Sequence, residues 1–472
     1  MPSRSPDRPA VSVRWPFRLS AVLKASVLCL ASVLFAAGAQ AAEKRPNVVL
    51  LVWDTTRADH LSLYGHERET TPNLDRIAKD GVVFTNGQTS GYWTLPAAAS
   101  LFTGLFAHNH LVDFAHFRTK DYSLEVPDAA VTLAEAFQAA GYRTGMFNAS
   151  KIITDNDSYK QGFDEFQFVG EGRLAGEALK FAEAEDERPF FIVMWYLTPH
   201  APYTPQAPYD KWVRADVPPV NIEGCNKRTG MPEGHVSQCD VNQGVVTLTD
   251  DQWDQLSRLY DGEILRNDTQ LGAFWDKLAA AGLTKDLVFA FTSDHGEAFN
   301  DHEMERAWHN FPYDNNQSVP LVVRYPEGMK SARVDTAVRT MDLYPTLLEL
   351  VKANVPAGLN ASSLIPVATG KETAHRVNVG GNHGGMQWYF DGRHKLIYVS
   401  RDQAHPFANP QLFDQNTDPH EDKSLAKIQP ELAKTVHTAA LDFFKSTQLG
   451  VGEGDGVNAE QLDLLREMGY IE

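Results

Sequence analysis

Short apolar runs alternate with amphipathic stretches along most of this chain. The segments 45–54, 142–149, 189–197 and 286–296 are rich in large apolar residues and have the length of buried strands. Between them, apolar positions recur at helical spacing, for example over 173–185. This alternation predicts an α/β fold with a mainly parallel central sheet.

Local signals mark several element ends. Thr249 and Gln252 have the spacing of a capping box at the start of a long helix that is expected to run toward Gly282. Gly141 is placed to close another helix, and Pro96 suits the first turn of a third. The remaining expected elements are helices over 71–81, 131–141 and 341–353 and strands over 82–89 and 319–326.

Two regions depart from this alternation. Residues 201–248 are rich in proline and have no clear period, so we interpret them as an insertion that covers or borders a site. Farther along, a hairpin is expected over 387–400 with its turn at Asp391 and Gly392, followed by a helix over 430–446. The pattern therefore predicts a main domain over 45–370 and a small C-terminal α+β subdomain over 371–472.

The composition is that of a globular protein with a large core. Hydrophobic residues make up 43% and charged residues 22% of the 472 residues, which excludes low-complexity, collagen-like and wholly disordered chains. The formal net charge at pH 7 is −18. Because binding to nucleic acid needs a surplus of Lys and Arg, we expect no nucleic-acid partner.

The N-terminus has the layout of a secretory signal peptide. Basic residues precede an apolar stretch of 13 residues at 25–37, and Ala39-Gln40-Ala41 follows as a cleavage site. The apolar stretch is shorter than the roughly 20 residues of a membrane span. We therefore expect residues 1–41 to be removed, a periplasmic or secreted protein, and no stable membrane span after cleavage. An uncleaved signal anchor is the alternative.

Cysteine usage agrees with an oxidising compartment. Cys29 would leave with the signal peptide, so that Cys225 and Cys239 remain in the insertion. These two residues are expected to form a disulfide, and two free thiols in a loop are the alternative. A zinc site is disfavoured because neither residue belongs to a Cys-x-x-Cys pair.

Candidate chemical groups follow two of the apolar runs and precede one helix. Asp54 ends the first run, and Asp294 and His295 follow a later one. Ligands of open α/β sheets bind at the carboxyl ends of strands, and carboxylates with an imidazole suit a divalent cation. Thr94 precedes the helix start at Pro96, where the helix dipole favours an anion. A hydroxyl, a metal and an anion site together indicate phosphoryl or sulfuryl transfer.

A series of longer segments occurs in a fixed order along the chain. They are RPNVVLLVWDTTRADHLSLYG, TPNLDRIAKDGVVFTN, TLPAAASLFTGLFAHNH, YLTPHAPY, FTSDHGE, VPLVVRYPEG, VRTMDLYPTLLEL, DGRHKLIYV and, at 462–471, LDLLREMGYI. They resemble the successive motifs of the sulfatase family in the alkaline phosphatase superfamily, and the resemblance covers almost all of 45–471. It implies a sulfatase-like sandwich, a catalytic main domain with a metal-centred site, and a small C-terminal subdomain.

Carried over by position, the resemblance implies that Asp54, Asp294 and His295 are metal ligands. Thr94 takes the position of the nucleophile and is expected to contact the same ion. One divalent ion is expected rather than two, because none of the 16 His follows an Asp by four residues, which is the spacing of a second metal pair. The sequence does not distinguish Ca, Mn, Mg and Zn.

The resemblance also places His200 and His309 beside the transferred group or the leaving oxygen, where either could act as an acid. The alternatives are that His200 caps a turn and that His309 makes a structural hydrogen bond. Ala149 stands where the family has a Lys, so we expect the nearby Lys151 to bind the anion instead. A solvated Lys151 is the alternative.

Several positions differ from the family pattern. Sulfatases proper carry Cys-x-Pro-x-Arg and oxidise the Cys to formylglycine, whereas this chain has Thr94 at the Cys position and Ala98 at the Arg position. Thr55 also replaces a second Asp. A formylglycine adduct can release sulfate by collapsing to the aldehyde, but a Thr adduct must be hydrolysed by water. We therefore expect a hydrolase of sulfuric or phosphoric esters in which Thr94 favours phosphoesters.

Two other functions stay open at this point. An envelope transferase for phosphoglycerol or phosphoethanolamine groups would have the same fold, although such relatives usually carry several membrane spans. A degenerate binding protein that has lost turnover is suggested by Ala98, Thr55 and Ala149. The substrate is expected to be a small-molecule, glycan or lipid-headgroup ester, and the sequence leaves the oligomeric state open.

Overall fold

A computed structural model of the protein describes residues 45–113, 123–225, 230–382, 385–399 and 409–448. From Pro46 onward the chain forms one compact unit. The expected signal peptide and the motif at 462–471 lie outside the described residues. Within the described ranges, no helix combines the length and the apolar character that crossing a membrane requires.

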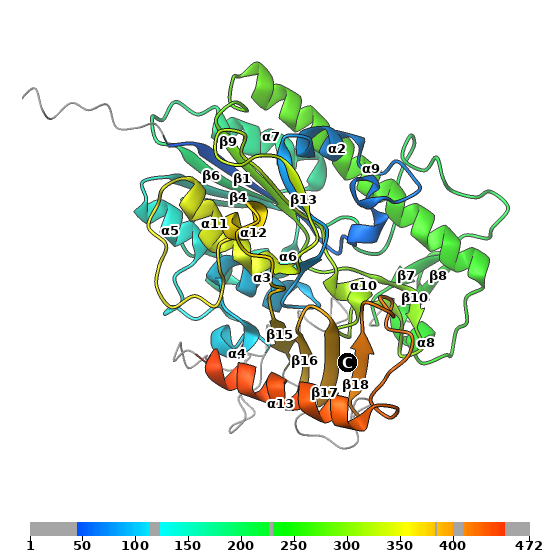
Figure 1. The fold of residues 1–472 in the computed structure, drawn as a ribbon. Coiled ribbons are helices and arrows are strands. Elements are labelled where there is room, and N and C mark those ends of the chain that lie inside the picture. Colours follow the sequence, from blue (N-terminus) through cyan, green and yellow to red (C-terminus); the bar gives the residue numbers. More distant parts are fainter. Residues whose placement is uncertain (1–44, 114–122, 226–229, 383–384, 400–408, 449–472) are drawn as a thin grey trace, which may run out of the picture. The chain divides into compact units, whose positions relative to one another are not determined.

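An eight-stranded sheet lies at the centre, in the order β13-β2-β12-β9-β1-β6-β4-β5 (Figure 1). Only β12 runs antiparallel to its neighbours, and the other five pairs are parallel, so the predicted mainly parallel sheet is confirmed. The strands are β1 (Asn47–Trp53), β2 (Gly81–Phe84), β4 (Arg143–Asn148), β5 (Glu165–Phe168), β6 (Phe190–Tyr196), β9 (Leu287–Thr292), β12 (Leu321–Arg324) and β13 (Ala332–Val334).

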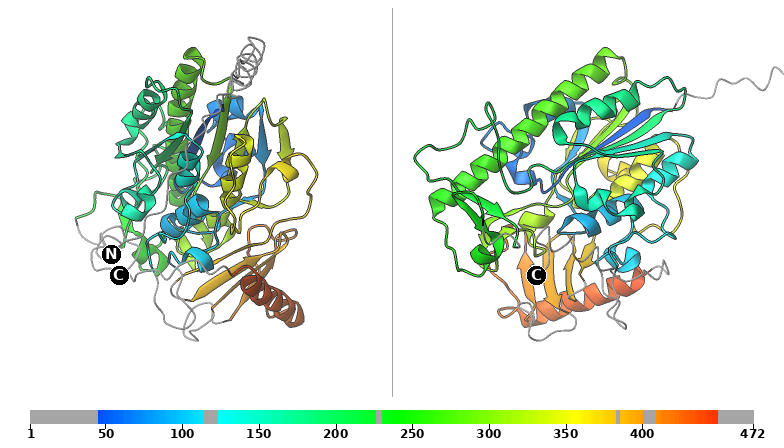
Figure 2. Two further views of the ribbon diagram at one scale, coloured as in Figure 1. Left: turned by 90° about the vertical axis from the view of Figure 1, so that its left-hand side faces the viewer. Right: turned by 180° about the vertical axis from the view of Figure 1, so that it is seen from behind.

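Helices cover both faces of this sheet (Figure 2). One face is covered by α2 (Pro72–Ala78), α7 (Glu171–Ala182) and α9 (Asp250–Ala280), and the other by α3 (Thr94–Thr103), α5 (Leu133–Ala139), α6 (Lys151–Thr154), α11 (Leu343–Leu350) and α12 (Ile365–Ala368). Successive residues of β1 point to opposite faces, so that Val49 and Leu51 belong to one core and Val48 and Leu50 to the other. Burial on both faces explains why the strand has no polar alternation.

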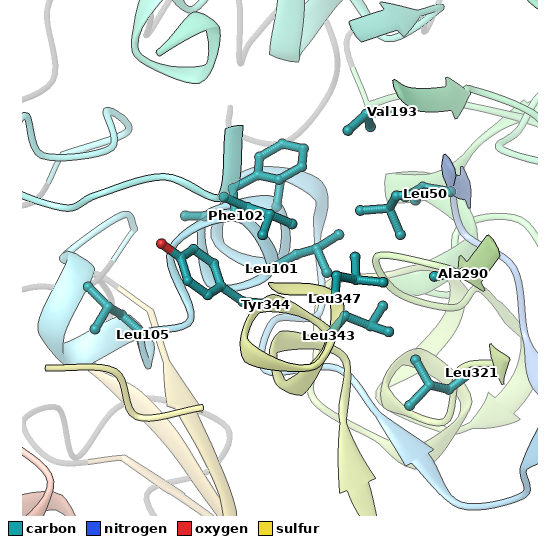
Figure 3. Close-up of a cluster of buried hydrophobic side chains, with 14 of the residues drawn as sticks. Leu50, Leu101, Phe102, Leu105, Val193, Ala290, Leu321, Leu343, Tyr344 and Leu347 are labelled. Carbon is teal, nitrogen blue, oxygen red and sulfur yellow. The ribbon is translucent and has the colours of Figure 1, made fainter. Parts of the chain in front are cut away.

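The core between α3 and the sheet fixes the position of α3. Leu101 of α3 lies beside Leu343 and Leu347 of α11, which face Leu50 and Ala290 of the sheet (Figure 3). Replacing a buried Leu by Ala in such a core typically costs about 2–5 kcal/mol. The helix is therefore held along its length, and its first residue, Thr94, is held with it.

The insertion at 201–248 contains more regular structure than expected. Strand β7 (Asn221–Glu223) pairs in parallel with β8 (His235–Ser237), and α8 (Gln238–Asn242) follows. These elements have three to five residues each, too few to produce a periodic pattern in the sequence. Cys225 and Cys239 form a disulfide, so the predicted pairing is confirmed and the free-thiol alternative is wrong.

Smaller elements border the carboxyl end of the sheet. The predicted strand over 82–89 is divided into β2 and β3 (Gly87–Gln88), and β3 pairs with β14 (Val338–Arg339) instead of continuing the main sheet. An antiparallel pair, β10 (Ala298–His302) and β11 (Glu305–Trp308), is followed by α10 (Asp314–Gln317).

The C-terminal part of the chain forms a second, antiparallel sheet. Its strands are β15 (Asn378–Gly381), β16 (Met386–Phe390), β17 (His394–Val399) and β18 (Gln411–Asp414), and they lie near α4 (Ala107–His110) and α13 (Pro430–Ser446) (Figure 1). Gly392 takes a left-handed φ of 96° at the hairpin turn between β16 and β17, as its place in the sequence predicts. The domain boundary near residue 370 stays a prediction.

A buried ion network joins the main domain to the start of this second sheet. Asp342 in the short helix η4 (Thr340–Asp342) is fully buried, and its two oxygens lie 2.8 Å from Arg339 Nη2 and 2.9 Å from Arg376 Nη1. Burial by itself would raise the pKa of Asp342, but the two guanidinium groups outweigh it and hold the pKa below its ordinary value. The carboxylate is therefore charged at neutral pH.

Replacing Asp342 by Asn should destabilise the fold by about 3–5 kcal/mol, because two buried guanidinium groups lose their counter-charge. Urea unfolding at pH 7 measures this loss. Asp276→Asn is the matched control, since the Asp276–Arg76 pair is exposed and should contribute less than about 1 kcal/mol. The Asp342 contribution should be complete above the ordinary carboxyl pKa of about 3.9 and vanish as the pH falls through the lowered pKa. Equal losses in the two variants would contradict this assignment.

Candidate active site

Three neighbouring strands bring the predicted ligands to one edge of the sheet. Asp54 follows β1, His200 lies just beyond β6, and Asp294 and His295 follow β9. Because β1 is paired in parallel with both β6 and β9, the carboxyl ends of all three strands lie at the same edge. The sheet order, together with the position of α3, accounts for a cluster whose members are up to 241 residues apart in the chain.

The ring of His295 is at the centre of this cluster. Its Nε2 atom lies 3.3 Å from Asp294 Oδ2, 3.7 Å from Asp54 Oδ1 and 3.3 Å from Thr94 Oγ1. All four side chains are buried. The structure thus brings the three predicted metal ligands and the predicted nucleophile into direct proximity.

Hydrogen bonds orient each carboxylate of the cluster. Asp54 Oδ2 accepts a hydrogen bond from Trp195 Nε1 at 3.2 Å. Asp294 Oδ1 accepts backbone N–H groups from Thr55 at 3.1 Å and from His295 at 2.9 Å. The opposite oxygens, Asp54 Oδ1 and Asp294 Oδ2, are buried and have no hydrogen-bond partner among the described residues. These two oxygens are the ones that face His295 Nε2.

The protonation of His295 follows from its other nitrogen. Nδ1 lies 2.9 Å from the carbonyl oxygen of Gly296, so Nδ1 carries the proton and Nε2 carries the lone pair. Burial lowers the pKa of His295 to about 3, which keeps the ring neutral. An imidazole lone pair and two carboxylate oxygens therefore face one another in a buried space.

The carboxyl groups of Asp54 and Asp294 also repel each other when both are charged. Burial, followed by the charge of Asp294, raises the pKa of Asp54 well above its ordinary value. Burial also raises the pKa of Asp294, to about 7, against the opposing effect of the backbone N–H groups that it accepts. A divalent cation would relieve this repulsion and satisfy the unpartnered oxygens, and carboxylate and imidazole are suitable donors for one. The residues present therefore fit a metal ion.

Thr94 is the first residue of α3, two positions before Pro96, where the sequence predicts the helix to start. The loop before it is fastened to the second sheet. The Tyr92 hydroxyl lies 2.6 Å from Asn382 Nδ2, and the Ser90 hydroxyl donates to Asn378 Oδ1 at 2.8 Å. The helix N-terminus provides unsatisfied N–H groups and a partial positive charge beside the Thr94 hydroxyl.

His200 and His309 line the same space. Their ring centres are 5.2 Å apart, and the His309 ring centre lies 4.3 Å from that of His295. His200 Nδ1 lies 2.7 Å from the carbonyl oxygen of Ala201, and its Nε2 atom has no partner among the described residues. Burial is the main cause that lowers the pKa of both rings, to about 4 for His200.

Lys151 is not part of this cluster. It begins α6, and its exposed side chain makes no hydrogen bond or ion pair with the described residues. It does lie close in sequence to the carboxyl end of β4, which pairs with β6. Its role in anion binding stays a prediction.

Two further side chains orient the cluster and are not among the residues predicted from the sequence. Trp195, the partner of Asp54, lies within an apolar strand and is indistinguishable there from a core residue. Glu297 lies 3.3 Å from His309 Nδ1 in the segment after His295. The sequence signal for Glu297 is its position two residues after His295, a candidate metal ligand.

A second group of possible metal ligands lies elsewhere, at His60, His66 and Asp261. The Asp261 oxygens lie 2.7 Å from His60 Nδ1 and 3.0 Å from His66 Nε2. Arg68 Nη1 also contacts Asp261 Oδ2, at 2.5 Å. A guanidinium on the carboxylate already supplies the counter-charge, so this group is explained as a structural ion network.

Comparison with known proteins agrees with this geometry. Residues 46–353 match the family model for sulfatases, and residues 305–441 match a model for the C-terminal part of N-sulphoglucosamine sulphohydrolase. An arylsulfatase of Clostridium perfringens is 25% identical over 446 aligned positions, covering 80% of this chain and 89% of the relative. The multifunctional alkaline phosphatase superfamily protein PehA of Trinickia caryophylli is 24% identical, with 81% and 91% covered.

The fold has counterparts among solved structures. The crystal structure of a phosphonate monoester hydrolase of Agrobacterium radiobacter superposes with a TM-score of 0.68 at 23% identity, covering 85% of this chain and 96% of that one. The family match extends over most of the chain and includes the strands and the helix that carry the buried cluster. The protein therefore belongs to the sulfatase family and is an ester hydrolase with an alkaline-phosphatase-like fold.

Proposed function

We propose that this protein is a metal-dependent hydrolase of phosphoric or sulfuric esters in which Thr94 is the nucleophile. The observation that carries the proposal is the set of buried acceptors formed by Asp54, Asp294 and His295 Nε2, with the Thr94 hydroxyl 3.3 Å from that nitrogen. These three acceptors suit a divalent cation, and the Thr94 hydroxyl lies beside them. Both contribute to covalent ester hydrolysis at phosphorus or sulfur in metal-dependent hydrolases.

Asp54, Asp294 and His295 would hold one divalent ion. When bound, such an ion lowers the pKa of a nearby hydroxyl and neutralises charge on the oxygens of the transferred group. Three protein ligands leave positions for Thr94 and for the substrate. The other cluster that resembles a metal site, at Asp261, already contains the guanidinium of Arg68.

The chain's own residues account for the remaining steps. Thr94 Oγ forms a bond to phosphorus or sulfur in line with the departing oxygen, which leaves with the bonding electron pair and takes a proton from His309 or His200. The N-terminus of α3 stabilises the negative charge on the transferred group. The proton of the Thr94 hydroxyl passes to solvent as Thr94 attacks. Water then attacks the adduct and returns a proton to that histidine, and the Thr94 oxygen leaves phosphorus or sulfur and takes a proton back from solvent.

The hydroxyl favours phosphorus over sulfur. A threonine ester of sulfate has no route of collapse and depends wholly on attack by water, as a phosphothreonine does. Position 98, where the family has an Arg, is a fully buried Ala in α3, so it offers no cation to the anion. The relative PehA is described as a multifunctional member of the superfamily, which agrees with a site that accepts more than one ester class.

The substrate is proposed to be a small-molecule, glycan or lipid-headgroup ester, met in the periplasm or outside the cell. The insertion borders the site through Tyr203, which packs against Tyr260 and Phe299 and whose phenol lies beside the Glu297 carboxyl group. Lys151, at the exposed start of α6, is proposed as a binder of the anion from the rim.

Replacing Thr94 by Ala should lower kcat by roughly a thousandfold or more, because the covalent step is lost. Thr94→Ser should keep measurable turnover, since it retains the hydroxyl. The measurement is hydrolysis of matched 4-nitrophenyl sulfate, phosphate monoester and phosphate diester with added Mn²⁺ or Ca²⁺. Sulfate turnover that exceeds phosphoester turnover would overturn the preference for phosphorus. Activity that survives in Thr94→Ala would overturn the nucleophile.

The purified protein should retain about one divalent ion per chain after dialysis, and Asp294→Asn should lose it, because one of the three ligand groups is removed. Elemental analysis by mass spectrometry counts the ions. Asp261→Asn is the matched control, since it alters the other buried His/Asp group and should keep the metal. Loss of the ion in Asp261→Asn but not in Asp294→Asn would show that the metal binds to the group of His60, His66 and Asp261, and would contradict the proposal.

A further inference from the structure

Glu297 lies in the segment between β9 and β10, two residues after His295. Its side chain is fully buried, and its Oε1 atom is 3.3 Å from Nδ1 of His309, whose side chain is also buried. The backbone of Glu297 is held as well, because Arg57 Nη1 donates to its carbonyl oxygen at 3.0 Å. The carboxyl group is thus fixed on one side of the His309 ring.

The backbone before and after His309 also fixes its position. Trp308 has a left-handed φ of 82°, which is rare for a bulky residue and turns the chain so that His309 enters the cluster. The carboxyl group of Glu305 accepts the backbone N–H groups of Asn310 and Phe311, the two residues that follow His309. A strained backbone that is retained beside a reacting group points to a function for the side chain it directs.

Glu305 and Glu297 are both fully buried, but they differ in what they bind. Both oxygens of Glu305 accept hydrogen bonds, Oε1 from the backbone at 310 and 311 and Oε2 from Asn316 Nδ2 at 2.6 Å. Glu297 Oε2 makes no well-formed hydrogen bond to a described residue, although the phenol of Tyr203 lies near the carboxyl group. Glu305 thus holds the backbone after His309, whereas Glu297 presents its carboxyl group to the ring of His309.

We infer that Glu297 is the positioning residue of His309 and, with it, forms the pair that delivers a proton to the leaving oxygen. The inference rests on the proposed function, in which His309 protonates that oxygen. Because Nδ1 faces Glu297, the transferable proton is the one on Nε2, the opposite nitrogen of the ring. Glu297 therefore selects which nitrogen of His309 acts, and it also holds the plane of the ring.

The proton balance of this step is as follows. Before transfer, the pair carries one proton between Oε1 and Nδ1 and a second on Nε2, so that its net charge is zero. The bond from phosphorus or sulfur to the leaving oxygen breaks, its electron pair stays on that oxygen, and the Nε2 proton moves to it. The pair is left as a carboxylate and a neutral imidazole protonated at Nδ1, and water entering the next step returns the proton.

Glu297→Gln tests the inference, because an amide keeps the size and a hydrogen bond but cannot carry the negative charge. Esters of 4-nitrophenol need little protonation as they leave, whereas esters of phenol need more. The variant should therefore lose at least about tenfold more kcat with the phenyl ester than with the 4-nitrophenyl ester, within the range of roughly 10²–10⁴ that general acids contribute. KM should stay within about twofold.

Glu263→Gln is the matched control. Glu263 is also a buried carboxyl, paired with Arg266 on α9 at 3.1 Å, and it is not in the catalytic cluster. Any loss there should be equal for the two esters. An equal loss for the two esters in Glu297→Gln, or no loss, would overturn the inference while leaving the Thr94 nucleophile intact.

A second readout does not require turnover. The ¹⁵N shifts of the His309 imidazole, identified by their disappearance in His309→Gln, report which nitrogen is protonated. They should show a proton at Nδ1 shared with Glu297, and Glu297→Gln should shift them by several ppm. An unchanged His309 spectrum would overturn the inference even if no test ester is hydrolysed, whereas a changed spectrum without turnover would count against the proposed function alone.

Discussion

The constraint on which this structure depends is the burial of three acceptors that face one another, two carboxyl oxygens and one imidazole lone pair. Asp54 Oδ1, Asp294 Oδ2 and His295 Nε2 converge because three parallel strands end at one edge of the sheet. Bringing two carboxylates and a lone pair together out of water is costly unless a cation joins them. The fold tolerates the arrangement because each group is oriented by a partner on its other side, namely Trp195, the backbone N–H groups at 55 and 295, and the carbonyl oxygen of Gly296.

The rest of the molecule can be understood as support for this edge. Helix α3 is pressed against the sheet by α11, so that the Thr94 hydroxyl lies against the His295 ring. The second sheet holds the loop before Thr94 through Asn378 and Asn382. The insertion, closed by its disulfide, contributes Tyr203, whose phenol lies beside the Glu297 carboxyl group. Segments that are far apart in the sequence therefore all help to position the residues around His295.

A threonine at the nucleophile position changes what the surrounding residues must do. Formylglycine supplies its own way of releasing the product, whereas the threonine ester proposed for this protein would be released by water and would depend more on nearby acids and bases. Three imidazole rings at 200, 295 and 309 lie within 5.2 Å of a neighbouring ring, and the one at 309 has a carboxyl partner. This concentration of imidazoles is consistent with chemistry that relies on proton transfer by side chains.

The sequence by itself determined the family, through its ordered motifs, and the alternation that builds the sheet. Strand ends and a helix start predicted that Asp54, Asp294, His295 and Thr94 belong to one site, and the family resemblance added His200 and His309 to that prediction. The sequence also determined the pairing of Cys225 with Cys239, since few alternatives existed. Only the tertiary structure decided that β12 runs antiparallel, that the insertion contains β7, β8 and α8, and that Lys151 stays at the surface. It alone identified Trp195 and Glu297 as partners of the site. The physical reason is that a hydrogen bond between residues far apart in the chain leaves no periodic trace in either segment, whereas burial of a strand or a helix face does.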